Sequence, residues 1–356
     1  MQTLTLDRIA PLLDGHVDIR RRANSIQPLR IPSAEAPLYD PFNRWVASAA
    51  AGVRLRFVTD SRRIVLSVSQ RLVPPTPPAF EARGLYDLYM HGGLARRVLA
   101  DGGALIDPDG TLSGDEAATA TFDDLPAGEK HIELWLPQAA TVSITGLAID
   151  AGARLAPWPD PRPRIVFHGS SITHCMEAAG ASAGWPAVAS RLAGLRHLNL
   201  GWGGSCLLSG LAARILRDQP ADAVVLKLGI NVWPDGALRE RTFQDSAHAM
   251  LSIIRERHAA TPIAMVSPIF SPGREDVGDN GGLSLGRMRD LLAQAVETRR
   301  AMGDANLHYL SGLALFGEAD AADLPDDLHP NTHGYRRMGE RFHALMLSGK
   351  DALLTA

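Results

Sequence analysis

Five short apolar runs alternate with long helical stretches after residue 164, and this alternation constrains the fold more than any other feature. The runs are RIVFHG (164–169), LRHLNLG (195–201), DAVVLKLG (222–229), PIAMVSPIF (262–270) and NLHYLSG (306–312). The helical stretches lie at 185–194, 209–219, 239–258, 285–303 and 334–347. Strands joined by helices form parallel sheets with right-handed crossovers and helices on both faces. The sequence therefore predicts a three-layer α/β domain that binds ligands beyond the carboxyl ends of its strands.

Before residue 156 the apolar pattern has a period of two. In GVRLRFVTD (52–60), Val53, Leu55 and Phe57 share one face, while Arg54 and Arg56 share the other. Similar runs occur at 62–70, 130–137 and 141–150, and turn-forming stretches occur at 73–78 and 107–110. Short alternating strands without a long amphipathic helix predict an antiparallel all-β sandwich or jelly roll.

Prolines at 157, 159, 161 and 163 mark the change from one pattern to the other. Proline lacks a backbone N–H and favours an extended chain, so a linker is expected there. We predict a β-sandwich domain at 1–155, a proline-rich linker at 156–163 and an α/β domain at 164–356. A chain of 356 residues is long enough to bury two such cores.

Composition and charge exclude several classes of protein. A formal net charge of −3 gives no basic surface for a nucleic acid or an anionic membrane. No run of 18 apolar residues and no signal-peptide pattern is visible, so we expect a cytoplasmic protein with no membrane partner. Cys175 and Cys206 fit no zinc spacing, and we expect free thiols, with a disulfide between them as the alternative. A homo-oligomer is left open.

Polar residues and glycines follow the apolar runs where parallel strands would end. A serine pair occupies 170–171, GWGGS occupies 201–205, Asn231 follows the third run, and Asp326 precedes His329 by three residues. A hydroxyl nucleophile needs a base, a group that orients the base, and donors for an oxyanion. Each piece alone is more often a helix cap or a turn. Their joint order along the chain indicates acyl-transfer chemistry.

The order and spacing of these residues distinguish two enzyme folds. An α/β-hydrolase elbow reads Gly-x-Ser-x-Gly, but position 173 is Thr. The constellation instead resembles the SGNH hydrolases, also called the GDSL esterase/lipase family, whose four blocks are named for Ser, Gly, Asn and His. The blocks here read Gly169-Ser170-Ser171, Asn199 to Gly204, Gly229-Ile230-Asn231 and Asp326 to His329. The resemblance covers roughly residues 164–348 and implies a flavodoxin-like parallel sheet.

The resemblance also implies a role for each matched residue. Ser171 would be the nucleophile, His329 its base, and Asp326 the acid that orients the base. The backbone N–H groups of Ser171 and Gly204, with the Asn231 side chain, would form the oxyanion hole. Position 170 holds Ser where the family has Asp, so the local hydrogen bonding must differ. This chemistry requires no metal and no cofactor.

The N-terminal half carries a second, shorter resemblance. Tyr86-Asp87-Leu88-Tyr89, within GLYDLYMHG (84–92), resembles the Gly-x-Asp-Leu-Tyr motif of a sandwich attached to some SGNH esterases, with the glycine one place early. An ordinary strand and turn is the alternative interpretation. Two-domain proteins of this sort resemble carbohydrate esterases that remove acetyl groups from sugars.

We therefore expect a serine esterase that hydrolyses short-chain, acetyl-type esters of a carbohydrate or a similar polar alcohol through an acyl-enzyme. The substrate would be a small-molecule or glycan ester. The alternatives are a longer-chain lipase or thioesterase, an acyltransferase, and a non-catalytic carbohydrate-binding protein. Trp202 and Trp233 lie beside the matched blocks and are candidates for pocket walls, with loop packing as the alternative. Segment 271–282 either overhangs the site as a mobile loop or is a disordered surface loop.

Overall fold

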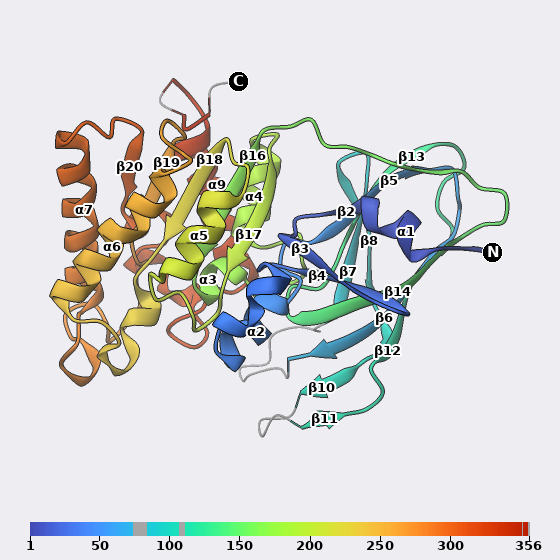
Figure 1. The fold of residues 1–356 in the computed structure, drawn as a ribbon, viewed down its shortest axis with the longest axis horizontal. Helices are drawn as coiled ribbons and strands as arrows, with labels where there is room; N and C mark the ends of the chain where they lie inside the picture. The colour runs from blue at the N-terminus through green and yellow to red at the C-terminus, as the bar shows by residue number, and fades with distance from the viewer. Residues whose placement is uncertain (74–83, 107–110, 351, 355–356) are drawn as a thin grey trace. The chain divides into compact units, whose positions relative to one another are not determined.

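The computed structural model describes residues 1–73, 84–106, 111–350 and 352–354 (Figure 1). The chain forms two compact units. One comprises Met1–Pro161 together with Ala178–Ser182, and the other comprises Arg162–Glu177 together with Ala183–Ala356. The turns expected at 73–78 and 107–110 lie outside the described residues, except for Val73.

The first unit contains two β-sheets that share one apolar core. Within the described residues the larger sheet has nine strands, with the main path β11-β10-β6-β14-β4-β3, and the smaller has six, with the main path β15-β5-β13-β7-β8. One hydrophobic cluster joins Val68 and Ile144 of the larger sheet to Leu55 and Leu134 of the smaller. The apolar faces of both sheets are therefore buried together.

The alternating runs of the sequence coincide with strands of this unit. The larger sheet comprises β1 (Gln2–Leu4), β3 (Asp18–Arg22), β4 (Ser25–Leu29), β6 (Ile64–Leu72), β9 (Asp101–Gly102), β10 (Ala104–Ile106), β11 (Leu112–Ser113), β12 (Ala117–Phe122) and β14 (Ala140–Ile149). The smaller comprises β2 (Leu13–Asp14), β5 (Arg54–Thr59), β7 (Leu85–Met90), β8 (Gly93–Leu99), β13 (Lys130–Trp135) and β15 (Leu155–Pro157). Its helical segments are α1 (Leu6–Ile9), η1 (Ala10–Leu12), η2 (Ser33–Leu38) and α2 (Pro41–Ser48).

The arginine face of β5 is buried rather than solvated. Arg54 is 1% exposed and its guanidinium lies over the ring of Trp135, 4.8 Å from the ring centroid. Arg56 is 3% exposed, pairs with Asp160 at 3.1 Å and lies 4.0 Å from the ring centroid of Trp158. Trp158 and Asp160 belong to the proline-rich stretch, so that stretch packs on the outer face of the smaller sheet instead of running free as a linker.

Asp87, in the Tyr-Asp-Leu-Tyr segment on β7, holds three parts of the first unit together. Its side chain is fully buried, and its two carboxylate oxygens accept hydrogen bonds from Arg97 on β8 at 2.6 and 3.0 Å. The backbone N–H and the hydroxyl of Ser182 donate to the same carboxylate at 3.1 and 2.6 Å. A buried carboxylate with four donors is satisfied, and it ties segment 178–182 to the sheet.

Replacing Asp87 by asparagine is expected to lower the free energy of unfolding by about 2–3 kcal/mol, because hydrogen bonds to a charged group are among the strongest that a protein makes. Chemical denaturation of the variant would measure the change. Asp7→Asn is the matched control, since the ion pair of Asp7 with Arg21 is largely exposed and should contribute little. Equal losses in the two variants would contradict the role given to Asp87.

The second unit is built on one sheet with strand order β17-β16-β18-β19-β20, and every neighbouring pair is parallel. The strands lie within the five apolar runs: β16 (Arg164–Gly169), β17 (Arg196–Gly201), β18 (Ala223–Lys227), β19 (Ile263–Val266) and β20 (Leu307–Leu310). The α-helices are α3 (Ser171–His174), α4 (Trp185–Leu192), α5 (Gly210–Asp218), α6 (Glu240–Arg255), α7 (Leu285–Ala301), α8 (Gly312–Leu315) and α9 (Thr332–Phe342). Among the described helices, none combines the length and the apolar character needed to cross a membrane.

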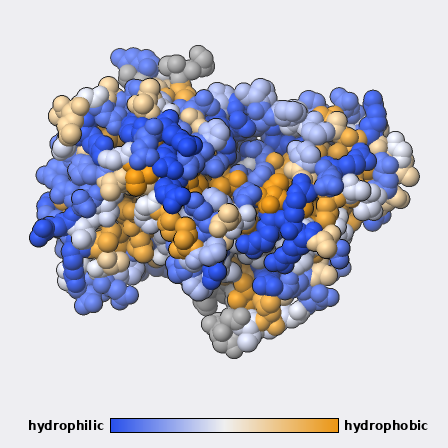
Figure 2. Space-filling model, viewed as in Figure 1, coloured by the Kyte–Doolittle hydropathy of each residue, from blue (hydrophilic) through white to orange (hydrophobic). Residues whose placement is uncertain are grey.

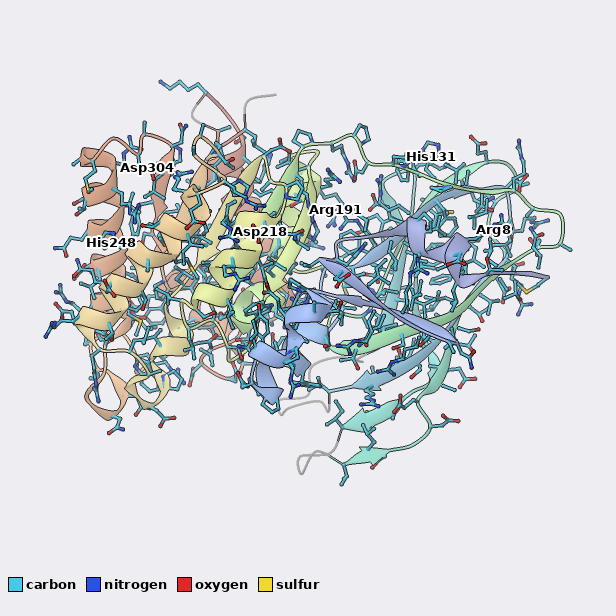
Figure 3. All side chains as sticks on the ribbon, in the orientation of Figure 1. Arg8, His131, Arg191, Asp218, His248 and Asp304 are labelled. Carbon is cyan, nitrogen blue, oxygen red and sulfur yellow. The ribbon has the colours of Figure 1, made fainter. Side chains whose placement is uncertain are left out.

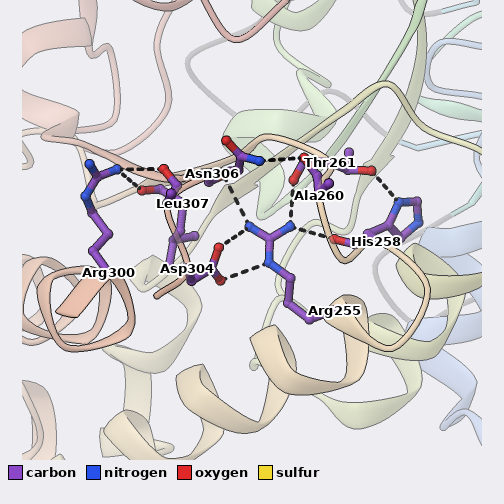
Figure 4. Close-up of polar contacts among 9 residues, drawn as sticks. Arg255, His258, Ala260, Thr261, Arg300, Asp304, Asn306 and Leu307 are labelled. Atoms are coloured by element: carbon purple, nitrogen blue, oxygen red, sulfur yellow. Dashed lines mark hydrogen bonds and ion pairs between the residues drawn. The ribbon is translucent and has the colours of Figure 1, made fainter. Parts of the chain in front are cut away.

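An arginine network fixes the ends of α6, β19 and β20 (Figure 4). Arg255, the last residue of α6, binds the carboxylate of Asp304 through two nitrogens, at 2.9 and 2.8 Å. The same guanidinium donates to the backbone carbonyls of His258, Thr261 and Asn306. Asp304 lies in the loop between α7 and β20 and is labelled in Figure 3, as is Asp218, the last residue of α5. These backbone carbonyls lie in the loops that lead into β19 and β20, so the network fixes where the chain enters each strand.

Candidate active site

The serine pair sits on the turn from β16 into α3, and its two members have different environments. Ser170 is the residue before the helix; it is 1% exposed, and its hydroxyl accepts a hydrogen bond from the N–H of Ile172 at 3.3 Å. It therefore caps the helix. Ser171 is the first helical residue and is partly exposed. The turn thus presents the hydroxyl of Ser171 and buries that of Ser170.

Ser171, His329 and Asp326 form one hydrogen-bonded chain. The Oγ of Ser171 lies 2.8 Å from Nε2 of His329, and Nδ1 of His329 lies 2.7 Å from a carboxylate oxygen of Asp326. The other oxygen of Asp326 accepts the backbone N–H groups of His329 and Leu328 at 2.6 and 3.1 Å. A carboxylate can only accept, so Nδ1 carries the proton and Nε2 is free to accept the serine proton.

The same contacts shift both titrating groups. Burial alone would lower the pKa of His329, but the hydrogen bond to Asp326 and the charges of Glu177 and Asp326 outweigh it, and the pKa is raised. Burial would raise the pKa of Asp326, but the hydrogen bonds from the side chain and backbone of His329 outweigh it and lower that pKa to about 2. The carboxylate therefore stays charged and stabilises the imidazolium that a proton transfer from serine would create.

Two glycines bring the second block close to the nucleophile. A Cβ at Gly203 would lie 3.5 Å from the Cβ of Ser171, so this backbone passes directly beside the serine. Gly204 has a φ of +70° and is exposed. Such a conformation favours glycine and leaves the backbone open to an approaching ligand.

The amide of Asn231 is oriented by the same loop. Its Oδ1 accepts the backbone N–H of Cys206 at 3.0 Å. With the oxygen held in this way, the NH₂ group points elsewhere, and the structure gives it no partner among the described residues. An asparagine with its oxygen fixed and its donors free is suited to stabilise a developing negative charge.

A family model and a solved structure both match this chain. The model of the GDSL-like Lipase/Acylhydrolase family matches residues 167–337. Among solved structures, the Salicylyl-Acyltransferase SsfX3 from a tetracycline biosynthetic pathway is 30% identical, with 93% of each chain covered and a TM-score of 0.82. This chain belongs to the GDSL-like lipase/acylhydrolase family.

Two more distant structures share the fold. A GDSL-like lipase candidate from Bacteroides ovatus is 21% identical over 96% of this chain and 95% of its own, with a TM-score of 0.72. A family two carbohydrate esterase from Clostridium thermocellum is 15% identical over 83% of this chain and 91% of its own, with a TM-score of 0.62. No match was found among curated proteins.

Asn199, the first residue of the family's second block, holds the nucleophile turn in place. Its side-chain NH₂ donates to the carbonyl of Thr173 at 2.8 Å, and its oxygen accepts the N–H of Gly201 at 2.7 Å. Gly201 has no room for a side chain, because a Cβ there would lie 2.2 Å from the backbone nitrogen of His174. These contacts explain why an Asn and a Gly occur at this spacing within the block.

The two tryptophans proposed as pocket walls have different environments. Trp202 is 1% exposed, and its ring packs against His168 with centroids 5.3 Å apart, so in this conformation it is a core side chain and cannot face a substrate. Trp233 is partly exposed and donates from Nε1 to the carbonyl of Val277 at 2.9 Å. The guanidinium of Arg274 lies 5.0 Å from the centroid of the Trp233 ring. Trp233 therefore remains the candidate wall.

Segment 271–282 is tied to the segment that carries the acid and the base. The hydroxyl of Ser271 and the guanidinium of Arg274 both donate to the carbonyl of Asp327, at 2.6 and 3.1 Å. Asp327 lies between Asp326 and His329 in sequence. These bonds hold the start of segment 271–282 against the segment that carries Asp326 and His329, which is unlike the mobile loop considered from sequence. Arg274 could not be predicted from the sequence, because nothing in a glycine-rich segment shows which charged side chain turns inward.

Glu177 is a second carboxylate near the base. It is 9% exposed and accepts a hydrogen bond from the hydroxyl of Tyr335 on α9 at 2.7 Å. Its charge contributes to the raised pKa of His329. The base therefore lies in the field of two carboxylates, one bonded to it and one acting at longer range.

Both cysteines are buried free thiols, so the disulfide considered as an alternative is not formed. Burial raises the pKa of Cys206 to about 12 and also raises that of Cys175. Thiols held in their protonated form are poor nucleophiles. Within the ranges that the structure describes, no group of three or more His, Cys, Asp and Glu side chains is arranged to hold a metal ion.

Proposed function

We propose that this protein is a serine esterase that transfers an acyl group from an ester to water through Ser171. The observation that carries the proposal is the position of His329, which bridges the Oγ of Ser171 at 2.8 Å and the carboxylate of Asp326 at 2.7 Å. His329 takes the proton of Ser171 as Oγ attacks the ester carbonyl carbon. Asp326 stabilises the imidazolium that results.

The negative charge that develops on the carbonyl oxygen would be stabilised by three donors. These are the backbone N–H groups of Ser171 and Gly204 and the free NH₂ of Asn231. One such donor is worth about 3 kcal/mol in a transition state. When the intermediate collapses, the bond from the carbonyl carbon to the alcohol oxygen breaks, and the imidazolium of His329 gives its proton to that oxygen. Water, deprotonated by His329, then releases the acid from Ser171.

The proposed substrate carries a short acyl group, with acetyl foremost, on a carbohydrate or similar polar alcohol. Two charged side chains lie near the base: Arg274, which stacks on Trp233 and binds the carbonyl of Asp327, and Glu177, which is buried. A long acyl tail gains about 0.8 kcal/mol for each CH₂ that it buries, but only against an apolar surface. The polar alcohol rests on the resemblance of the Tyr86–Tyr89 segment alone.

A second candidate function is transfer of the acyl group to another alcohol instead of water. The likeness to the Salicylyl-Acyltransferase SsfX3, which extends over 93% of both chains at 30% identity, favours it. The chemistry up to the acyl-enzyme is the same in both cases, and the two differ only in which hydroxyl His329 activates in the second half. Competition between water and an added alcohol for the acyl-enzyme separates them.

The kcat/KM for p-nitrophenyl esters is expected to be highest for the acetate and to fall through butyrate, octanoate and palmitate. A maximum at octanoate or longer would replace the short-chain proposal with a lipase or thioesterase. In the same assay, added sugar alcohols should leave the yield of acetate unchanged if water is the acceptor. Conversion of most of the acetyl group into a sugar ester would favour the acyltransferase.

The pH profile is expected to show an acid limb above the ordinary histidine value of 6.5, because His329 must be neutral to accept the proton and its pKa is raised. Activity should rise as pH passes that pKa. Glu177→Gln removes one of the charges that raise the pKa of His329, so the acid limb should move to lower pH. Arg274→Gln removes a charge that lowers this pKa, so the acid limb should move to higher pH. Shifts in the reverse directions in kcat/KM profiles would contradict His329 as the base.

A further inference from the structure

The outer face of the larger sheet in the first unit is a concave surface rich in arginine. Strand alternation turns Ile26, Val68, Val142 and Ile144 into the core. Residues that alternate with these on β4, β6 and β14, together with residues of β3, line a groove of about 1080 Å³. These lining residues are Arg20 and Arg22 on β3, Gln27 on β4, Ser69 and Arg71 on β6, and Thr141 and Ser143 on β14.

Helix α2 forms one wall of this groove. It packs on β4 and β14 and contributes Phe42, Arg44 and Trp45 to the lining. Arg30, which is fully buried, donates to the carbonyls of Val46 and Ala49 and so anchors the end of the helix to the sheet. This wall of the groove is therefore fixed to the sheet of the first unit.

The charges in the groove are unbalanced. Four arginines line it, against one carboxylate, Glu116. Glu116 is already engaged, because it pairs with Arg71 at 2.8 Å and accepts the hydroxyl of Ser69 at 2.8 Å. Arg20, Arg22 and Arg44 form no ion pair within the described ranges. Arginine forms paired hydrogen bonds with carboxylates, so three such groups around one groove favour an anionic ligand.

The remaining lining groups fit a saccharide. Hydroxyls and an amide form the floor, where they can exchange hydrogen bonds with sugar hydroxyls. Phe42 is 53% exposed, and its ring centroid lies 5.8 Å from that of Trp45, which provides an aromatic surface on the wall. On β10 and β11, Ile106 and the exposed Leu112 line the groove, and hydrophobic colour gathers over these strands in Figure 2. Sugars present apolar C–H faces as well as hydroxyls, and this mixture of surfaces matches both.

A peptide fits this surface less well. The floor is the face of a sheet whose backbone groups already pair between neighbouring strands, as in the register of β6 with β14. An added peptide strand needs unpaired backbone groups at an edge. Recognition in the groove must therefore come from side chains, and those side chains are cationic, hydroxylated and aromatic.

We propose that this groove is a binding site for an acidic oligosaccharide, one whose sugars carry carboxylates. Arg20, Arg22 and Arg44 pair with the carboxylates, the floor hydroxyls bind the ring hydroxyls, and Phe42 packs on a sugar face. All the lining residues belong to the first unit, and Ser171 belongs to the second. The site goes beyond the proposed esterase and does not depend on it.

Calorimetric titration of the full-length chain with tetragalacturonate tests the proposal, with neutral cellotetraose and inorganic sulfate as comparison ligands. The protein is first labelled at Ser171 with a fluorophosphonate, or carries Ser171→Ala if no label is taken up, so that a binding signal cannot come from turnover. Tetragalacturonate should bind, cellotetraose should bind at least tenfold more weakly, and the affinity should fall as salt is added.

Variants locate the site. Arg22→Gln and Arg44→Gln should each weaken tetragalacturonate binding about tenfold, and Phe42→Ala about threefold to tenfold. Arg21→Gln is the matched control, because Arg21 lies on the same strand but faces the other way and pairs with Asp7 at 2.9 Å. It should leave the affinity unchanged. The proposal is overturned by no binding, by equal binding of the neutral and acidic tetramers, by sulfate binding alone, or by equal losses in Arg21→Gln and Arg22→Gln.

Discussion

Replacing Ser171 by alanine is expected to lower kcat/KM about 10⁴- to 10⁶-fold, because the variant has no hydroxyl to form the acyl-enzyme. The Oγ of Ser171 is the atom that lies 2.8 Å from Nε2 of His329. Steady-state hydrolysis of p-nitrophenyl acetate measures the loss. The double variant Ser171→Ala with His329→Ala should be little worse than either single variant, since the two side chains act as one unit.

Ser170→Ala is the matched control, one residue away on the same turn. The hydroxyl of Ser170 is buried and caps α3, so its loss should cost about 1 kcal/mol of stability and leave kcat/KM within about tenfold of the parent. A large loss in Ser170→Ala with activity retained in Ser171→Ala would show that the nucleophile had been assigned to the wrong serine.

Asp326→Asn is expected to lower kcat about 10³- to 10⁴-fold, because an amide can donate to Nδ1 of His329 and favour the wrong tautomer. Nε2 would then carry the proton and could no longer accept one from Ser171. The carboxylate also binds the backbone N–H groups of His329 and Leu328, so the loop itself depends on it. The steady-state kcat of the variant, with circular dichroism to verify folding, measures the effect.

Asp327→Asn separates the chemistry of Asp326 from the presence of a charge nearby. Asp327 has a φ of +59°, a conformation that asparagine adopts readily, and the structure uses its carbonyl rather than its carboxylate to bind Ser271 and Arg274. Activity should change less than threefold. Similar losses in the two variants would show that the acid had been misassigned.

Periodicity located the strands of the second unit because buried parallel strands need continuous apolar runs, and the five runs coincide with β16 to β20. The joint order of the serine pair, Asn231, Asp326 and His329 along the chain also indicated acyl-transfer chemistry. Periodicity could not show which residues pack over each face of a strand. Arg54 and Arg56 lie on the polar side of β5 as the pattern predicts, yet they are buried, because Trp158 and Asp160 pack over them.

The sequence also could not predict which way side chains in loops point. Trp202 and Trp233 both lie beside family blocks, but Trp202 turns into the core and Trp233 stays partly exposed. The charge of Glu177 at His329 and the bond of Arg274 to Asp327 depend on how distant segments meet. No local sequence pattern encodes contacts between distant segments, so the structure was needed to assign roles to these residues.

The assignment of Ala178–Ser182 to the first unit means that the chain leaves the second unit and returns to it just after α3. The proline-rich stretch is therefore not a place where the protein divides into two exchangeable modules. Residues 1–161 exchanged for those of a relative would arrive without the segment whose Ser182 binds Asp87, and a chain expressed from residue 162 would carry that segment without its partner. Grafts that move the first unit must carry Ala178–Ser182 with it, because the chain passes between the two units at three places: 161/162, 177/178 and 182/183.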